Sequence, residues 1–468
     1  MALDISIDPT DKPEESWHPA RLIPVVGIRS VKEQEQRATS ALLAVMGIVP
    51  SFGKVILSYL NAPAGQISTF TEVQFEDEDG IAIPDGVIIV ERGKTRWVCL
   101  VEVKTGDAEL TAEQINRYMG IAVANGFDAV LSISNQIVSS PDALPFKPNK
   151  RLLNKLEAVR HLSWFRIFTE AVIKNQRHGI SDPEQAWILG QLVDYLDSEK
   201  SGAGGFEGMG ADWVAVRNAA RQRTLRPGDK GIGSVASDWV QFVEYLCLGL
   251  RQKLIREVTP VYPRASDAKS RFAVHCDTLG ARDEHKLKAT VRVPDAVGHV
   301  NIEADLVSRQ VTTSIEVKAP REGRAKTRVN WLLRQLKDAP PDTRIEVKFP
   351  HTRDSTSALV ADVQKSPETV LLTSDPKKEP KAFVVAVTRE MGEKRGKGHG
   401  SFVAITRAQV LDFYRDVVQN LTAWQPRPPK LAEPKEAEKE PEVTSHESLP
   451  GVLSIPQPEV HQVSGADE

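Results

Sequence analysis

The stretch from residue 83 to residue 118 restricts the fold of this chain more than any other. Two apolar runs, 87–90 and 97–103, are rich in β-branched and aromatic residues and are separated by a polar turn at 91–94. Such runs predict two buried strands joined as a hairpin. A helical pattern follows, and a further apolar run at 129–133 predicts another strand. An antiparallel hairpin followed by a helical crossover to a parallel strand indicates an α/β core with a mixed sheet.

Five polar side chains in this stretch are predicted to meet. Asp85 stands at the head of the first strand, and Glu102 and Lys104 lie near the end of the second. Alternate residues of a strand share a face, so Glu102 and Lys104 project together. On the helix, Gln114 and Tyr118 are four residues apart and share one face. A packed amphipathic edge is the alternative explanation of that helical pair.

Two carboxylates that point into one space repel each other, and a divalent cation relieves the repulsion. All-oxygen ligation suits Mg²⁺ or Mn²⁺. A lysine beside such a metal can hold a water or stabilise charge on a phosphate. The spacing of Asp85, Glu102 and Lys104 therefore suggests metal-assisted hydrolysis of phosphodiesters.

Three short motifs carry a family resemblance: Pro84-Asp85, then Glu102-Val103-Lys104, then the segment from Gln114 to Tyr118. Their order resembles the PD-(D/E)xK nuclease superfamily, in the form with a QxxxY motif that RecB and Holliday-junction resolvases carry. The resemblance covers roughly residues 30–140. It implies a restriction-endonuclease-like mixed sheet flanked by helices. It also implies catalytic roles: Asp85 and Glu102 hold Mg²⁺ (or Mn²⁺), Lys104 assists the attacking water, and Gln114 and Tyr118 line the site.

Three further acids are candidates for the same site. In the resembled family the first core helix often supplies another acid, and the helix predicted after Ser30 carries Glu33 and Glu35. Ser30 and Glu33 have the spacing of a capping box, so the favoured explanation is that both acids stabilise the helix N-terminus. Glu72, in a strand predicted within 66–75, is within reach of Asp85, but an exposed strand carboxylate is the favoured explanation there.

Composition narrows the class of protein. A chain of 468 residues predicts two or three domains. The net charge of −3 leaves no whole-chain positive field, so a nucleic-acid partner requires a local basic patch. Three widely spaced cysteines argue against a zinc or disulfide framework and fit a reducing cytosol. The acidic N-terminus and the absence of a long apolar run predict a cytoplasmic protein with no membrane segment.

Shifts in composition predict the domain boundaries. The expected parts are a flexible leader (1–20), a nuclease-like domain (21–197), a glycine-rich basic linker (198–235), a second α/β domain (236–425) and a disordered tail rich in proline, glutamate and lysine (426–468). The tail leaves room for a protein partner. Oligomeric state is left open.

The second half repeats the element order of the first. A helix is predicted at 238–256, strands at 286–293, 299–307 and 312–318, a helix at 329–336 and a strand at 344–349. This order predicts a degenerate second copy of the core, with Asp305, Glu316 and Lys318 as its counterpart residues. A third Glu-Val-Lys at 346–348 shows that the tripeptide alone proves little. Lacking a QxxxY pair, this copy is expected to bind rather than cleave.

Basic residues of the second half are the candidate nucleic-acid contacts: Arg324 and Arg328 in the loop that enters the helix, and Lys394, Arg395 and Lys397 in a glycine-rich loop at 391–400. That loop is predicted to join strands at 382–388 and 402–406, with a closing helix at 411–421. A generic exposed hairpin tip is the alternative.

These features favour a Mg²⁺-dependent nuclease that acts on DNA, in repair, stress response or defence. A non-catalytic nucleic-acid or protein-binding module on the same fold is the alternative from another class. A nuclease active only within a larger assembly is a third hypothesis. The choice between endonuclease and exonuclease, between DNA and RNA, and between strand preferences stays open.

Overall fold

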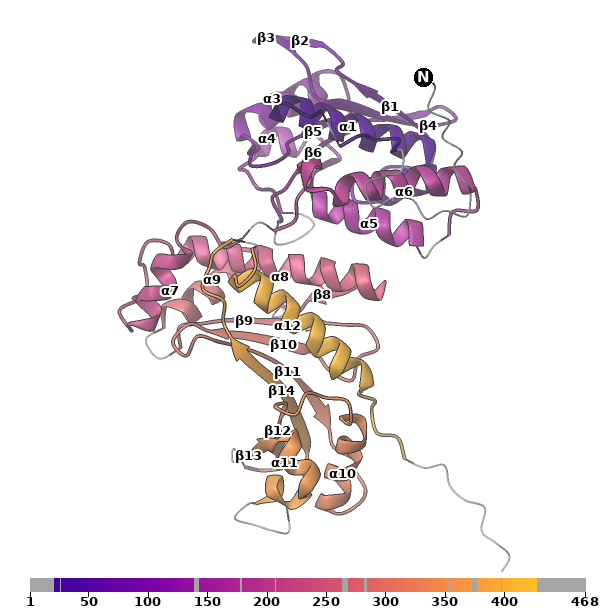
Figure 1. Ribbon diagram of the computed structural model, residues 1–468. Coiled ribbons are helices and arrows are strands. Elements are labelled where there is room, and N and C mark those ends of the chain that lie inside the picture. The colour runs from indigo at the N-terminus through magenta and orange to yellow at the C-terminus, as the bar shows by residue number, and fades with distance from the viewer. Residues whose placement is uncertain are drawn as a thin grey trace, which may run out of the picture. The chain divides into compact units, whose positions relative to one another are not determined.

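Figure 1 shows a computed structural model of the chain. It describes residues 21–426 apart from 26, 139–142, 177–178, 207, 263–267, 282–283, 353–354, 373–377 and 397. The compact unit that contains the described residues up to Gln425 ends there. The predicted leader, and the predicted tail from residue 427 onward, lie outside the described residues.

The first half forms a mixed five-stranded sheet in the order β1-β4-β5-β6-β7. The first three of these strands pair antiparallel, and β5, β6 and β7 pair parallel. The hairpin and the helical crossover predicted from the sequence are therefore confirmed. The strands are β1 (Gln66–Thr71), β4 (Gly86–Arg92), β5 (Thr95–Val103), β6 (Ala129–Ser134) and β7 (Ala158–Ser163).

The hairpin between β4 and β5 is tighter than the sequence suggested. Strand pairing continues to Arg92 opposite Thr95, so only two residues form the turn. Gly93, the first of them, has a positive φ of 61°, a conformation that glycine adopts at little cost. This register pairs Gly86 with Val101 and so sets which residues face each other at the far end of the hairpin.

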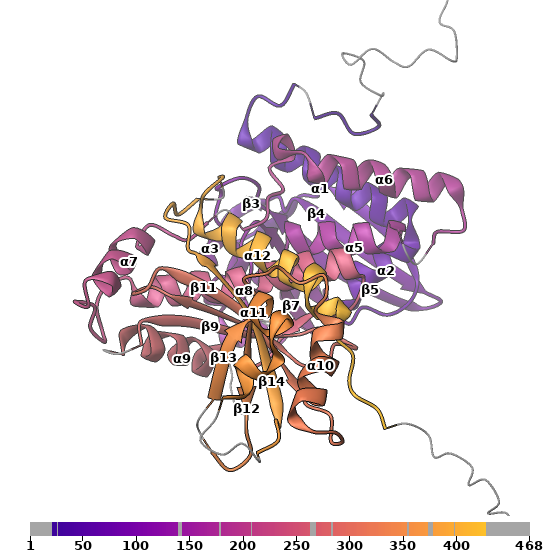
Figure 2. The ribbon, with the colours of Figure 1, turned by 60° about the horizontal axis from the view of Figure 1, so that its bottom comes forward.

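Helices cover both faces of this sheet, and side-chain parity assigns each β5 residue to a face. Cys99, Val101 and Val103 pack with the helices on one face, while Val98 and Leu100 pack with α3 on the other. Figure 2 shows α1 beside α6 on the first of these faces, where the two helices are in contact. The helices are α1 (Val31–Ile48), α2 (Pro50–Ser58), α5 (Trp164–Gln176) and α6 (Pro183–Asp197) on one face, with α3 (Ala112–Ala124) and α4 (Lys150–Leu153) on the other.

The strand predicted within 66–75 is two separate elements. β1 ends at Thr71, and a small hairpin of β2 (Phe75–Asp77) and β3 (Gly80–Ala82) follows. The hairpin is attached to α3 because the Arg117 guanidinium donates two hydrogen bonds to the Asp77 carboxylate, both 2.8 Å long. Glu72, which falls between the two elements, is therefore not a strand residue.

A second, seven-stranded sheet has the order β13-β12-β14-β11-β10-β9-β8, and every described pairing in it is antiparallel. The strand after the helix, β12, pairs with β14 and not with β11, so the strand pairing of the first half is not repeated. Its strands are β8 (Thr259–Pro260), β9 (Lys286–Arg292), β10 (Val300–Asp305), β11 (Gln310–Lys318), β12 (Arg344–Lys348), β13 (Ser355–Leu359) and β14 (Ala382–Glu390).

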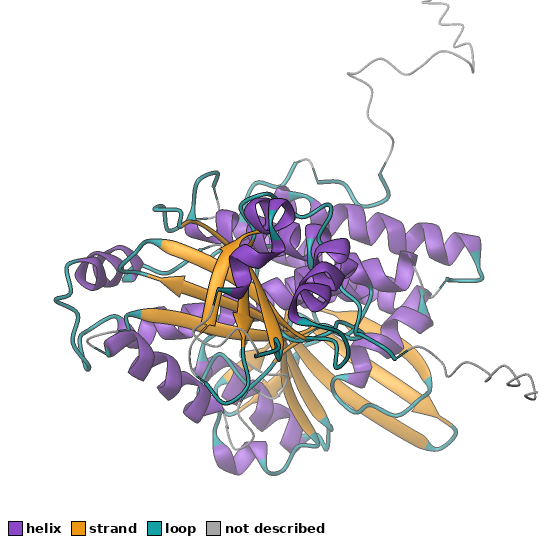
Figure 3. Cartoon of the chain, turned by 90° about the horizontal axis from the view of Figure 1, so that it is seen from below, coloured by secondary structure: helices purple, strands orange, loops and turns teal. Residues whose placement is uncertain are grey.

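Both sheets carry helices, as Figure 3 shows. In the second half α8 and α12 share a large apolar core with the strands. The α-helices there are α8 (Ile232–Leu254), α9 (Ala268–Gly280), α10 (Ala325–Gln335), α11 (Val360–Lys365) and α12 (Phe402–Asp416), and the 3₁₀ helices are η2 (Pro367–Leu371) and η3 (Val418–Asn420).

The segment 402–406, predicted as a strand, is instead the first part of α12. Ser401 caps this helix, because its hydroxyl accepts a hydrogen bond from the Ala404 N–H. Phe402 and Val403 are buried at its start. The short apolar run was therefore misassigned, since periodicity alone does not distinguish a strand from the buried start of a helix.

The segment predicted as a linker is packed against the rest of the unit. It contains a 3₁₀ turn, η1 (Glu199–Ser201), and the helix α7 (Trp213–Arg221), while α8 already begins at Ile232. Phe206, Met209 and Trp213 are buried in the core of the second half. Glycine content suggested a free tether, but these widely spaced apolar residues anchor the segment.

The three cysteines are free thiols. Cys99 and Cys247 are buried and Cys276 is partly buried.

Among the described helices, none taken singly has both the length and the apolar character needed to cross a bilayer. Only α1 and α2 taken together pass by length and composition, and a bend of 111° separates them.

Candidate functional site

Asp85 and Glu102 meet at the open end of the β4–β5 hairpin. Asp85 comes directly before Gly86, which pairs with Val101, so the register places Asp85 opposite Glu102. The Asp85 Oδ2 accepts the Val103 N–H at 2.8 Å, and the carboxyl groups of Asp85 and Glu102 share a hydrogen bond. Glu102 is only 1% exposed. The two acids that the sequence paired are therefore neighbours in a largely dry environment.

Lys104 joins this pair from the same strand. Its ammonium donates to Glu102 Oε1 at 2.7 Å and lies 3.5 Å from Glu35 Oε2, on α1. The Thr105 N–H also donates to the Glu35 carboxylate. One cation therefore stands among three carboxyl groups, those of Asp85, Glu102 and Glu35.

Gln114 and Tyr118 reach the same centre from α3. The Gln114 side-chain amide donates to Glu102 Oε1 at 2.6 Å and to the Tyr118 oxygen at 3.4 Å. The Tyr118 hydroxyl donates to the Ile83 carbonyl at 3.3 Å, two residues before Asp85. The helical pair therefore contacts the acids directly and also fixes the chain that leads into β4.

The pKa values report the crowding of negative charge. Burial and the adjacent Asp85 charge raise the pKa of Glu102 to about 8, although Lys104 opposes this. Burial, with the Asp85 charge in the same direction, also raises the pKa of Glu35 against the opposing charge of Lys104. Burial lowers the pKa of Lys104, but its contacts with Glu102, Glu35 and Asp85 outweigh burial and raise it. Lys104 therefore stays protonated. Its single positive charge does not balance the carboxyl groups around it.

Tyr118 is not a base in this arrangement. Burial and the charge of Glu102 raise its pKa to about 12. The phenol therefore keeps its proton at neutral pH and serves as a hydrogen-bond donor.

The backbone of Lys104 is held on both sides. Its N–H donates to the Ile133 carbonyl of β6 at 2.8 Å. Its carbonyl accepts the indole N–H of Trp164, a fully buried residue, at 2.9 Å. The role of Trp164 was not predicted, because nothing in the sequence relates an indole to a strand end some sixty residues earlier.

A polar cavity of about 730 Å³ opens beside the acids. Glu35 and Asp85 line it together with Gln36 and Glu72, and the Gln36 side-chain amide donates to Glu72 Oε1 at 2.8 Å. The remaining lining residues are Lys32, Thr39, Ser40, Thr71, Gln74, Ile83 and Pro84. Such a lining suits a hydrated, polar ligand better than an apolar one.

The three additional acids have different outcomes. Glu33 stabilises the helix start, as favoured: its N–H donates to Ser30 Oγ and its carboxylate accepts the Arg29 N–H. The explanation favoured for Glu35 was wrong, because its carboxylate contacts Lys104. Glu72 is exposed, as favoured, yet it lines the same cavity as Asp85.

The donor set of the centre fits a hard divalent cation. Asp85 and Glu102, with Glu35 near them, present oxygen atoms only, which is the preference of Mg²⁺ and Mn²⁺. In the part of the chain that the structure describes, no group of three or more acid, histidine or cysteine side chains has the arrangement of a metal site. Mg²⁺ commonly uses one or two carboxylates with waters and substrate oxygens. Asp85 and Glu102 supply that number of carboxylates.

The second candidate set, Asp305, Glu316 and Lys318, is not brought together. Asp305 ends β10 beside the turn into β11, where its Oδ1 accepts the N–H groups of Val307 and Ser308, both at 2.9 Å. Glu316 and Lys318 lie at the opposite end of β11 and are exposed. The length of the hairpin separates the two acids, so no shared site forms.

Arg328 has a local structural role. Its guanidinium donates to the carbonyls of Gly323 and Pro380, both at 2.9 Å, and of Arg321 at 3.1 Å. These bonds close the loop before α10 and use most of its donors. Arg324, the N-cap residue of α10, is exposed.

The glycine-rich loop at 391–400 keeps two of its predicted cations at the surface. Lys394 and Arg395 are exposed, and the Arg395 carbonyl accepts the Met209 N–H at 2.9 Å. Lys397 lies outside the described residues. The loop is therefore tied to Met209 by its backbone, while the Lys394 and Arg395 side chains are exposed.

Comparisons with protein-family models, with curated proteins and with solved structures found no match to this chain.

Proposed function

We propose that this chain is a Mg²⁺- or Mn²⁺-dependent nuclease that hydrolyses DNA phosphodiester bonds in the cytoplasm. Its first half would be a restriction-endonuclease-like core of the PD-(D/E)xK kind. The observation that carries the proposal is the convergence of Asp85, Glu102 and Lys104 at one strand end, with Gln114 and Tyr118 bonded around them. Strand parity, helix spacing and motif order selected these five residues from the sequence.

The charge balance supports a site that acts on phosphates. Asp85 and Glu102 would hold the divalent cation, which supplies positive charge to the oxygens of a phosphodiester. Lys104, kept protonated by its acidic neighbours, would orient an attacking water and stabilise the negative charge that develops. Gln114 would hold Glu102 in place through its 2.6 Å hydrogen bond.

The adjoining cavity supports a polar substrate. Its lining of hydroxyl, amide and charged side chains offers partners to sugar and phosphate oxygens and little apolar surface for a hydrophobic ligand. Lys32 provides a cation at this cavity. The donors in the cavity do not distinguish deoxyribose from ribose, so DNA is the substrate to be tested first and RNA the comparison.

The test is cleavage of linear, nicked, branched and single-stranded DNA by the purified full chain with Mg²⁺ or Mn²⁺. We expect Asp85→Asn, Glu102→Gln and Lys104→Met each to lower the rate by about a hundredfold or more, as for loss of a positioned catalytic group. All three substitutions preserve approximate side-chain size.

A matched control comes from the third Glu-Val-Lys of the chain, in β12. Glu346→Gln and Lys348→Met change the same tripeptide outside the candidate centre and should leave the cleavage rate unchanged. Cleavage that survives Asp85→Asn or Lys104→Met would show that the nuclease centre is elsewhere. No cleavage of any DNA or RNA substrate would refute the proposal.

A further inference from the structure

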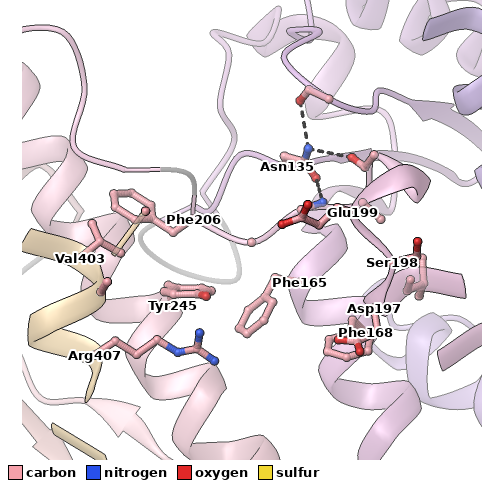
Figure 4. A pocket seen from close by; sticks show the side chains of 18 of the residues that line it. Asn135, Phe165, Phe168, Asp197, Ser198, Glu199, Phe206, Tyr245, Val403 and Arg407 are labelled. Atoms are coloured by element: carbon pink, nitrogen blue, oxygen red, sulfur yellow. Dashed lines mark hydrogen bonds between the residues drawn. The ribbon is translucent and has the colours of Figure 1, made fainter. Parts of the chain in front are cut away.

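A second cavity, of about 860 Å³, has a lining different from that of the cavity beside the acidic centre. Its wall combines the end of α6 and the following glycine-rich segment with residues of α5, α8 and α12. The side chains of Phe165, Phe168, Phe206, Tyr245 and Arg407 line it, as Figure 4 shows. Ligand cavities in proteins commonly measure about 300–1,000 Å³, so this one has room for a nucleotide-sized molecule.

The aromatic wall is a continuous surface. The rings of Phe165 and Tyr245 have centroids 4.5 Å apart, and Phe206 and Phe168 extend the group at 6.2 Å from Tyr245 and Phe165 respectively. Gly205 makes the close approach possible, because a Cβ there would lie 2.6 Å from a Tyr245 ring carbon. The rings are tilted, by 48° between Phe165 and Tyr245 and by 41° between Phe165 and Phe168, so a nucleobase would stack on one ring and contact the edge of its neighbour. Stacking on aromatic rings is tolerant of base identity.

One cation stands at this wall. The Arg407 guanidinium lies over the Tyr245 ring, 5.3 Å from its centroid, and Figure 4 shows it directed toward Phe165. Among the described residues no carboxylate forms an ion pair with Arg407. An arginine held by a ring keeps its donors for an anion.

The opposite side of the cavity is acidic, and hydrogen bonds hold its backbone in place. Asp197 and Glu199 line it. The Asn135 side chain fixes the segment between them and the aromatic wall: it donates to the carbonyls of Gly106 and Gly202, both at 2.9 Å, and accepts the Gly204 N–H at 2.7 Å. The cavity therefore has a cationic end at Arg407 and an acidic end at Asp197 and Glu199, whose carboxylates can accept hydrogen bonds.

We propose that this cavity binds a nucleotide unit. The phosphate would contact Arg407, the base would lie against the Phe165–Tyr245 surface, and amino or hydroxyl donors of base and sugar would face Asp197 and Glu199. The glycine-rich loop also contributes Gly398 to the lining, and Lys394 and Arg395 are exposed on that loop. A strand leaving the cavity would therefore meet further cations. This proposal stands on its own and does not depend on nuclease activity.

The test measures binding to the full chain in the presence of EDTA, so that no metal-dependent cleavage interferes. The probes are adenosine 5′-monophosphate, followed by calorimetry, and a short fluorescein-labelled oligodeoxyadenylate, followed by anisotropy. We expect Arg407→Gln to weaken binding of the probe about tenfold, the usual effect of losing one charged contact to phosphate. Arg407→Lys keeps the charge but not the planar fork, so its affinity should lie between those of the unaltered chain and Arg407→Gln.

Arg415→Gln is the matched control, since Arg415 is exposed on the same helix and pairs with Asp412 and Asp416. It should bind the probe as the unaltered chain does. Binding of the monophosphate identifies a free nucleotide as sufficient, while binding of the oligonucleotide alone identifies a strand; either supports the proposal. Absence of binding by both probes, or equal affinity in Arg407→Gln and the unaltered chain when both give the same circular-dichroism spectrum, overturns it.

Discussion

Glu102 should make the metal-free protein less stable as pH rises, and Glu102→Gln should remove that dependence. The raised pKa of Glu102, about 8 against an ordinary value of 4.5, means that the folded protein binds this proton more tightly than the unfolded chain. Between these two values the folded state keeps the proton and the unfolded state releases it. The free energy of unfolding therefore falls with pH across this window and levels off above the folded-state pKa.

The magnitude follows from the pKa difference. Each pH unit inside the window costs about 1.36 kcal/mol per proton. Between about pH 5.5 and pH 8.5 the loss attributable to Glu102 comes to about 3 kcal/mol. Glu102 is almost fully buried, so solvent screening reduces this figure little. Glu35, whose pKa is also raised, adds to the loss in the same direction.

The assay is urea denaturation of the unaltered chain and Glu102→Gln at both pH values, with EDTA. Other groups titrate in both proteins, so the difference between the two proteins isolates Glu102. Repeating the measurement with Mg²⁺ adds a second test. If the acids hold the cation, Mg²⁺ should restore stability at the higher pH in the unaltered chain and have little effect in the variant.

Glu346→Gln serves as the control and should follow the unaltered chain at every pH. Parallel pH profiles for the unaltered chain and Glu102→Gln would refute the electrostatic argument. A pH dependence of the expected size that Mg²⁺ leaves unchanged would keep the crowding of charge but reject the cation site.

Two further substitutions test how the candidate centre is held. Trp164→Phe leaves the Lys104 carbonyl without its indole donor and should lower the free energy of unfolding by about 1–3 kcal/mol, measured in urea, and slow DNA cleavage. Asn135→Ala removes three hydrogen bonds to Gly106, Gly202 and Gly204. Limited proteolysis of the variant should therefore be faster within 198–206. An unchanged pattern of proteolytic fragments would contradict the role given to Asn135.

The first half of the fold was predictable because its signals are local and agree with one another. Residues 87–90 and 97–103 have strand composition, and strand parity alone puts Glu102 and Lys104 on one face. The hairpin register then sets Asp85 opposite Glu102. Trp164 was not predicted, and Glu35 was named only as a less favoured candidate, because their contacts with Lys104 depend on tertiary packing, which periodicity does not encode.

The second half shows where element order fails. The succession of strands and helix resembled that of the first half, but pairing partners decide a sheet, and β14 enters between β11 and β12. No local sequence pattern predicts that β14 pairs between β11 and β12. Asp305 and Glu316 have a plausible separation in sequence, yet they occupy opposite ends of one hairpin. A motif therefore gains weight only when strand register has been established.

The contact between Gly106 and Gly202 has a consequence for biosynthesis. The Gly106 N–H donates to the Gly202 carbonyl at 2.9 Å, and Gln34, next to Glu35, donates to the Lys200 carbonyl at 3.0 Å. During translation the N-terminal region folds as it emerges, and β5 needs only β4 and β6 for its pairing. The contacts of Gly106 and Gln34, which flank the candidate centre in sequence, form only after residues 200–202 have left the ribosome.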